Sequence, residues 1–259
     1  MKRDRTQVCI LTHSPCHLRY GSAMHPDPNN PWSYIKGLEP VSFCDWPGRT
    51  SLVLFTGTCN LRCPTCHNPD LARRPERLAG ISRDMLLRRV RSKGSWIDGV
   101  VVSGGEPCGV PGLEHILEAI ADLDLPVKLD SNGFYPQVLE HLLQRDLVSL
   151  FAVDVKGPFD RYPDLTGNRA DPEEARANLE RVFALAGKRP ERFLFRCTHV
   201  PGLTEQDLDR VRGYLPRTHT LSVQQYRHPP PPVDELSASG TRDAEAINQE
   251  TDGTATGGA

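Results

Sequence analysis

The sequence has no long hydrophobic run. Its longest apolar stretch, at about 147–155, is interrupted by Ser149 and Asp154, and it is far shorter than the roughly 20 residues that a helix needs to cross a bilayer. The apolar run at 8–11 is too short for the core of a signal peptide. We therefore expect a cytoplasmic protein without a membrane partner.

The sequence also has no excess of basic residues. The 259 residues include 31 Lys and Arg against 33 Asp and Glu, for a formal net charge of −2. A protein that binds nucleic acid usually carries a basic excess, so we expect no nucleic-acid partner. A phosphate-binding P-loop, a G-x-G-x-x-G dinucleotide fingerprint and a zinc-protease histidine spacing are absent as well.

Polar segments lie at both ends of the chain. Residues 1–33 are rich in Pro, His and Asn without a clear period, and we expect a loosely ordered extension there. Residues 228–259 run from four prolines into a polar stretch that cannot bury enough apolar surface to offset the entropy of ordering. We predict a disordered tail at 228–259 and one folded domain at 34–227, a length that suits a single α/β barrel.

Short apolar runs alternate with helical patterns inside this domain. Helix starts are readable at Asp171, which precedes Pro-Glu-Glu, and at Thr204, which is followed by Asp207. Such alternation implies a parallel sheet with right-handed crossovers. The predicted strands are 52–55, 100–102, 127–129, 150–155, 193–197 and 221–224. Six such units form either an open doubly wound sheet or a partial barrel, and composition does not separate the two.

Three of the eight cysteines, Cys59, Cys63 and Cys66, lie within eight residues. Thiolate is the soft ligand that iron–sulfur clusters prefer, and a short loop of this kind can hold three corners of one cluster. One iron then lacks a cysteine, which leaves the open position that a catalytic metal needs. The alternative on spacing alone is a zinc site with His67 or a distant cysteine as the fourth ligand.

Further groups of polar residues follow the predicted strands. They are Gly104, Gly105 and Glu106; Asp130, Ser131 and Asn132; Asp154 and Lys156; and Gln224, Gln225, Tyr226 and Arg227. Paired glycines let a ligand approach the backbone, and an acid beside them can take an ammonium group. Each group alone also fits an ordinary turn or a structural ion pair. Because parallel α/β folds place their sites at the carboxyl edge of the sheet, we expect these groups to converge there.

The C-x-x-x-C-x-x-C spacing resembles the signature of the radical SAM enzymes, which cleave S-adenosylmethionine (SAM). Residues 35–49 and the run CHNP at 66–69 resemble the activating enzymes of glycyl radical proteins. Within these, the phrases KLDSNG, VDVKGPFDRYPDLTG and VPGLTEQD are most similar to the activating proteins of anaerobic ribonucleoside-triphosphate reductases. The resemblance covers about residues 34–227, and it implies a partial (β/α)6 barrel of the TIM type.

The resemblance also implies a ligand set. Cys59, Cys63 and Cys66 would hold a [4Fe–4S] cluster whose fourth iron binds the amino and carboxylate groups of SAM. The residues expected to contact SAM are Gly104, Gly105 and Glu106 at the methionine ammonium, Ser131 and Asn132 near the ribose and methionine, Lys156 at the carboxylate and His67 near adenine. Asp130 and Asp154 match acids that in some activases line a monovalent-cation site close to SAM.

The reaction implied is reductive cleavage of SAM to a 5′-deoxyadenosyl radical, which takes a hydrogen atom from a glycine of a partner enzyme. The cofactors carry this chemistry, so no catalytic side chain is expected beyond the cluster and SAM. A flavodoxin- or ferredoxin-type protein would supply the electron. The alternatives are a small-molecule enzyme resembling 7-carboxy-7-deazaguanine synthase and a non-enzymatic zinc-binding module.

Overall fold

The computed structural model describes residues 25–93 and 96–228. Most of the expected N-terminal extension and nearly all of the expected tail lie outside these residues, so both stay predictions. None of the helices in the described ranges is long and apolar enough to cross a membrane.

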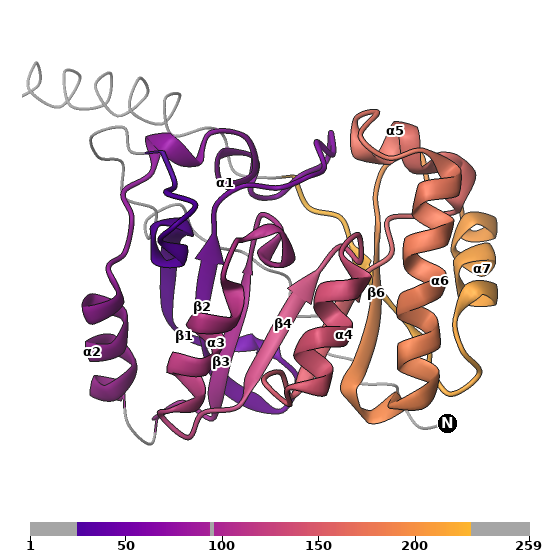
Figure 1. Cartoon of the computed structure of the whole chain (residues 1–259). Helices are drawn as coiled ribbons and strands as arrows, with labels where there is room; N and C mark the ends of the chain where they lie inside the picture. The colour runs from indigo at the N-terminus through magenta and orange to yellow at the C-terminus, as the bar shows by residue number, and fades with distance from the viewer. Residues whose placement is uncertain (1–24, 94–95, 229–259) are drawn as a thin grey trace, which may run out of the picture.

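One seven-stranded sheet runs through the described chain, with the strands paired in sequence order (Figure 1). The strands are β1 (Ile35–Trp46), β2 (Arg49–Thr56), β3 (Gly99–Gly104), β4 (Val127–Ser131), β5 (Leu150–Asp154), β6 (Phe193–His199) and β7 (Leu221–Gln225). From β2 to β7 every neighbouring pair is parallel. All six predicted strands are present, and the open sheet of six parallel strands confirms the α/β fold expected of a partial barrel.

The additional strand, β1, was not predicted. It pairs antiparallel with β2 across a two-residue turn, Pro47-Gly48, in which Gly48 has φ 75°. Its pairing register shifts three times, which explains why its sequence lacks a clean alternation. Pro40 is tolerated because β1 is an edge strand, where a missing N–H disturbs no ladder between inner strands.

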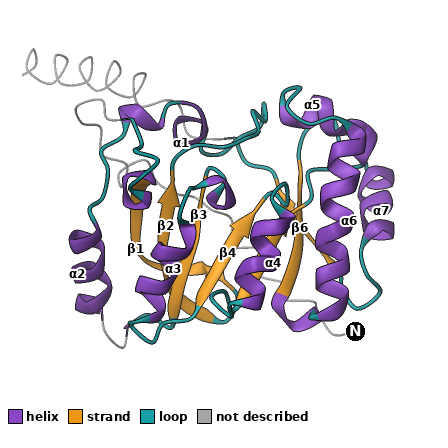
Figure 2. Cartoon of the chain, in the orientation of Figure 1, coloured by secondary structure: helices purple, strands orange, loops and turns teal. Residues whose placement is uncertain are grey.

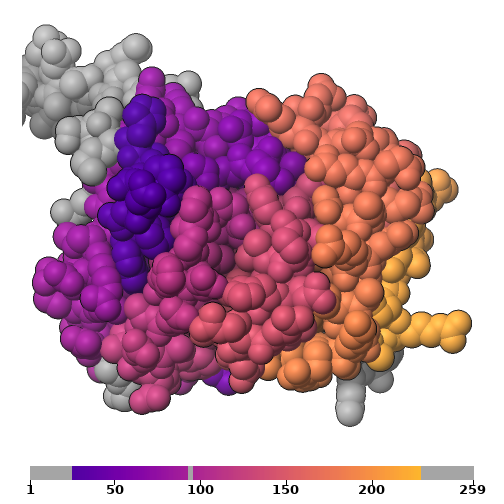
Figure 3. Space-filling model, in the orientation of Figure 1, coloured from indigo at the N-terminus to yellow at the C-terminus, as the bar shows by residue number. Residues whose placement is uncertain are grey.

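The helices follow the strands in the order expected of β/α units (Figure 2). They are α1 (Pro69–Arg73), α2 (Arg83–Lys93), α3 (Leu113–Ala121), α4 (Pro136–Gln144), α5 (Tyr162–Thr166), α6 (Pro172–Lys188) and α7 (Glu205–Tyr214). Both predicted helix starts are correct: the Asp171 carboxylate accepts a hydrogen bond from the Glu174 N–H, and Thr204 forms a capping box with Asp207. The space-filling view from the same side shows the successive segments packed against one another in the order of the sequence (Figure 3).

Apolar side chains cover both faces of the sheet. On one face Leu52, Leu54 and Val100 belong to the large core that also includes Ile116 and other helix residues. On the other face a smaller cluster joins Trp46, Val53, Phe55, Val101, Leu71 and Leu78. Burial on both faces is typical of parallel sheets, and it leaves the carboxyl edge of the strands as the place for polar groups.

The capping box of α7 gives a test of how this helix is held. The Asp207 N–H donates to the Thr204 hydroxyl at 3.2 Å, and the Thr204 N–H donates to the Asp207 carboxylate at 3.0 Å. We expect Thr204→Ala to lower the free energy of unfolding by about 1 kcal/mol, because one helix N–H loses its partner. Thr204→Ser keeps the hydroxyl and should lose much less. Urea denaturation measures both, and equal losses would contradict this account.

Candidate functional site

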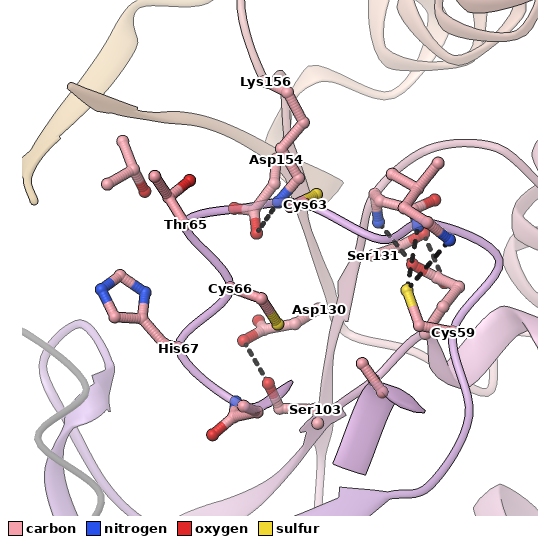
Figure 4. A pocket seen from close by; sticks show the side chains of 18 of the residues that line it. Cys59, Cys63, Thr65, Cys66, His67, Ser103, Asp130, Ser131, Asp154 and Lys156 are labelled. Atoms are coloured by element: carbon pink, nitrogen blue, oxygen red, sulfur yellow. Dashed lines mark hydrogen bonds and ion pairs between the residues drawn. The ribbon is translucent and has the colours of Figure 1, made fainter. Parts of the chain in front are cut away.

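The candidate site lies at the carboxyl edge of the parallel strands. One pocket is lined by Gln224 and by twelve other residues that the sequence suggested: Cys59, Cys63, Cys66, His67, Gly104, Gly105, Glu106, Asp130, Ser131, Asn132, Asp154 and Lys156. Gln225, Tyr226 and Arg227, which the sequence also suggested, are not among the residues that line it. The twelve come from the loops or ends of β2, β3, β4 and β5, and Figure 4 shows the pocket from close by. The expected convergence is therefore found for the groups that follow β2, β3, β4 and β5 and only in part for the group after β7, while the role of each residue stays a prediction.

The start of the cysteine loop packs directly against the two glycines that follow β3. The Gly105 N–H donates to the Thr56 carbonyl at 2.9 Å, and the Glu106 N–H donates to the Thr58 carbonyl at 2.8 Å. A Cβ at Gly105 would lie 1.8 Å from the Thr58 carbonyl oxygen, and Gly104 has φ 117°. The sequence suggested that these glycines admit a ligand; in the structure they also admit the backbone of the loop.

Two further contacts hold the middle of the loop. The Arg62 N–H donates to the carbonyl of Thr166, the last residue of α5, at 3.0 Å. The Arg73 guanidinium on α1 donates to the Cys63 carbonyl at 2.9 Å. Contacts within the chain itself thus hold the start and the centre of the loop.

The three thiols of this loop are free and face the same pocket. Burial, reinforced by the Glu106 carboxylate, raises the pKa of Cys59 to about 12, and burial also raises the pKa of Cys66. These two thiols therefore hold their protons at neutral pH until a metal displaces them.

A single zinc ion was the alternative to a cluster at these thiols. Among the described residues no three Cys, His, Asp or Glu side chains converge as the ligands of one metal ion would. Ligands of a cubic cluster bind different irons and can lie further apart. His67, one of the two candidates for the fourth zinc ligand, places Nε2 2.8 Å from the Arg227 carbonyl oxygen, and its ring lies on the opposite side of the loop from the Cys66 sulfur (Figure 4).

Glu106 joins the ends of β3 and β4. Its side chain is 1% exposed, and its carboxylate accepts hydrogen bonds from the Asn132 N–H at 2.6 Å, the Ser131 hydroxyl at 2.9 Å and the Cys108 N–H at 3.0 Å. Burial raises the pKa of Glu106, and these donors oppose the rise. Asn132 then donates to the Asn60 side chain at 2.8 Å, which ties the end of β4 back to the cysteine loop.

A row of charged side chains crosses β4, β5 and β6 at the pocket. Arg196 on β6 donates through Nε to Asp154 at 2.8 Å and lies 3.4 Å from Asp130. Lys128 contacts Asp130, and Lys156 lies 3.4 Å from Asp154. The sequence analysis did not single out Arg196 or Lys128. Both are charged residues inside largely apolar strands, and this pattern in the sequence could have indicated a buried role for them.

The row keeps its acids ionised. Burial alone would raise the pKa of Asp154, but the positive charges of Arg196 and Lys156 outweigh it and lower that pKa to about 2. The pKa of Asp130 is lowered in the same way, against burial, by Arg196 and Lys128. Lys156 keeps its proton, because the negative charge of Asp154, joined by those of the cysteines where they ionise, outweighs burial and raises its pKa.

The sequence model of the radical SAM superfamily matches residues 53–215, which include the cysteine loop and nearly all of the pocket. The chain belongs to the radical SAM superfamily. The resemblance inferred from the cysteine spacing is thereby confirmed, and the protein is an enzyme of this superfamily. Membership implies SAM as a cofactor and an iron–sulfur cluster, and the thiols and polar residues described above are the candidates to hold them.

Within the superfamily, the chain is similar in sequence to proteins named as activating enzymes. A Methanocaldococcus jannaschii protein, provisionally named a glycyl-radical enzyme activating enzyme, is 30% identical over 194 residues, which is 74% of this chain and 79% of that protein. The pyruvate formate-lyase-activating enzyme of Clostridium pasteurianum is 32% identical over 145 residues, or 51% of this chain and 57% of the relative.

Solved structures agree on the fold. Streptococcus suis SuiB bound to S-adenosylmethionine matches 75% of this chain with a TM-score of 0.53 at 14% sequence identity. This chain spans less than half of that structure, 46% of its length. At this identity the match supports the shared architecture of the radical SAM core and nothing finer.

Gly105 gives a test of how the cysteine loop is seated. We expect Gly105→Ala to lower the free energy of unfolding by about 1–3 kcal/mol, because the new methyl group forces backbone apart. Gly213→Ala is the matched control, since nothing lies within 4 Å of a Cβ there. It should leave stability unchanged or raise it slightly. Equal stability of the two variants by chemical denaturation would show that the close approach is not needed.

Proposed function

We propose that this radical SAM enzyme binds a [4Fe–4S] cluster through Cys59, Cys63 and Cys66 and reductively cleaves SAM to install a glycyl radical on a partner enzyme. The observation that carries the proposal is the shared pocket. Three thiols of one loop face the same space as the polar ends of β3, β4 and β5. That arrangement supplies the soft ligands of a cluster and, beside them, polar groups for the amino-acid end of SAM.

The residues of this chain would bind and orient SAM. Lys156 remains cationic and lines the pocket, so it is suited to the methionine carboxylate. The turn of Gly104, Gly105 and Glu106 lines the pocket and would take the ammonium group, and Ser131 with Asn132 would offer short polar groups to the ribose and methionine. When bound, the cluster supplies one electron and SAM supplies the radical. The remaining task of the protein is to position SAM and exclude water.

His67 is proposed to lie near adenine. Its ring lies beside that of Tyr226, the residue after β7, with the two ring centroids 5.5 Å apart. Cys66, His67 and Asn68 line one side of the pocket, so the proposed adenine position lies against this segment. No side chain is required as a general base, so a catalytic residue beyond the cluster and SAM is not proposed.

The partner is proposed by similarity. Relatives named for glycyl-radical enzyme activation and for pyruvate formate-lyase activation support a glycyl radical protein as the substrate. The phrases KLDSNG and VPGLTEQD favour anaerobic ribonucleoside-triphosphate reductase among such partners. We further propose a cytoplasmic location and a flavodoxin- or ferredoxin-type electron donor.

The proposal predicts that removal of one cluster ligand abolishes SAM cleavage. Cys63→Ala, reconstituted anaerobically with iron and sulfide and then reduced, should form no 5′-deoxyadenosine above background, because one corner of the cluster loses its ligand. Cys197→Ala is the control: this thiol is buried in a separate apolar cluster and should leave nucleoside formation close to that of the native chain. Liquid chromatography of the quenched reaction measures both.

Two outcomes would overturn parts of the proposal. If the native chain contains its cluster but forms no 5′-deoxyadenosine, the proposed SAM chemistry is wrong. If nucleoside forms but no glycyl radical signal appears on the reductase by electron paramagnetic resonance, the proposed partner is wrong. Conversion of a small molecule instead would favour the enzymes that resemble 7-carboxy-7-deazaguanine synthase.

A further inference from the structure

Asp130 and Asp154 were expected to line a monovalent-cation site. In the structure their carboxylates instead contact cationic side chains of the chain itself. For Asp130, Oδ1 contacts the Lys128 ammonium, while Oδ2 accepts from the Ser103 hydroxyl at 3.0 Å and lies 3.4 Å from the Arg196 guanidinium. For Asp154, Oδ1 accepts from Arg196 at 2.8 Å and Oδ2 lies 3.4 Å from the Lys156 ammonium. All four carboxylate oxygens thus have donors from the chain itself.

The positions of Lys128 and Arg196 on their strands bring both side chains to the two acids. Lys128 and Asp130 are two residues apart on β4 and share one face of the sheet. Arg196 pairs directly with Asp154 in the register of β5 and β6, so its guanidinium reaches Asp154 and extends to Asp130. Lys128 is 1% exposed and Arg196 is 7% exposed. Neither can leave the acids without exposing them or taking a buried charge elsewhere, which is costly.

A monovalent metal ion would therefore have to displace a tethered cation. It would also lose water on entering this partly buried position, where the Asp130 side chain is 8% and the Asp154 side chain 31% exposed, and both changes oppose binding. Asp45 on β1 adds negative charge near Lys128, but its carboxylate already accepts a hydrogen bond from Ser42. The acids of this site fit the cations of the chain, and they do not fit an additional metal ion.

We infer that Asp130 and Asp154 bind no monovalent metal ion in this enzyme, and that the Lys128 ammonium and the Arg196 guanidinium supply the positive charge between them. The inference rests on the proposed function in one respect, because the pocket beside these acids is the proposed SAM site. It predicts that SAM binding and cleavage do not require potassium or sodium.

The first test compares salts. The reconstituted native enzyme should bind SAM, and form 5′-deoxyadenosine, equally well in potassium chloride, sodium chloride and tetramethylammonium chloride at matched ionic strength. We expect differences below about twofold, within ordinary effects of salt on surface charges. A loss of about tenfold or more in tetramethylammonium, restored by potassium, would overturn the inference.

The second test removes the tethered ammonium. Lys128→Met has a similar shape without the charge, so it frees one oxygen of Asp130 for a small cation. We expect this variant to bind SAM on the order of tenfold more weakly than the native enzyme in tetramethylammonium, and to recover in potassium, because a buried carboxylate loses its partner. Lys188→Met, at an exposed lysine at the end of α6, should behave like the native enzyme in every salt. A Lys128→Met variant that binds SAM equally in all three salts would contradict the role given to Lys128.

A third readout needs neither SAM nor the cluster. An ion that binds only the folded chain raises its unfolding temperature. The native protein without cofactors should unfold at the same temperature in all three salts, and a rise specific to potassium or sodium would overturn the inference. A native enzyme that fails to cleave SAM in any salt but shows this salt-independent unfolding would reject the proposed function and leave the inference standing.

Discussion

The pocket depends on one close approach of backbones. Gly104 and Gly105 at the end of β3 lie against Thr56 and Thr58 at the start of the cysteine loop, at a distance that no side chain at Gly105 would allow. Because the loop begins there, the same contact sets where the three thiols lie. The next residue, Glu106, extends the connection to β4, so the carboxyl ends of three neighbouring strands are joined through one short segment.

Buried charge at this edge is balanced within the sheet. Arg196 bridges acids from β4 and β5, and Lys128 on β4 and Lys156, two residues after the end of β5, complete the row. Buried ions are costly unless they are paired and hydrogen-bonded, so the row favours one relative position of the three strands. It also leaves charged groups in place beside the thiols. Apart from Lys128, the same charged residues therefore hold the strands together and line the proposed SAM site. A substitution at one of them is expected to lower both the stability of the chain and its binding of SAM.

Much of this could be predicted from local patterns in the sequence. The six parallel strands and two helix caps followed from alternation and capping residues, and the convergence of polar groups followed from the general geometry of parallel sheets. What escaped prediction depends on contacts between distant segments. The irregular β1 has no clean period, and the pairing of Arg196 with Asp154 depends on register between β5 and β6. The packing role of Gly105 requires knowing that Thr58 lies against it.

The most direct test of the central claim is spectroscopic. The chain would be reconstituted anaerobically, analysed for iron and sulfide, reduced, and examined by electron paramagnetic resonance with and without SAM. The account predicts about four irons and four sulfides per chain, and a cluster signal that changes when SAM is added, because SAM would bind beside the three thiols at the iron without a cysteine. A colourless zinc protein, or an iron-loaded protein whose signal is indifferent to SAM, would contradict it.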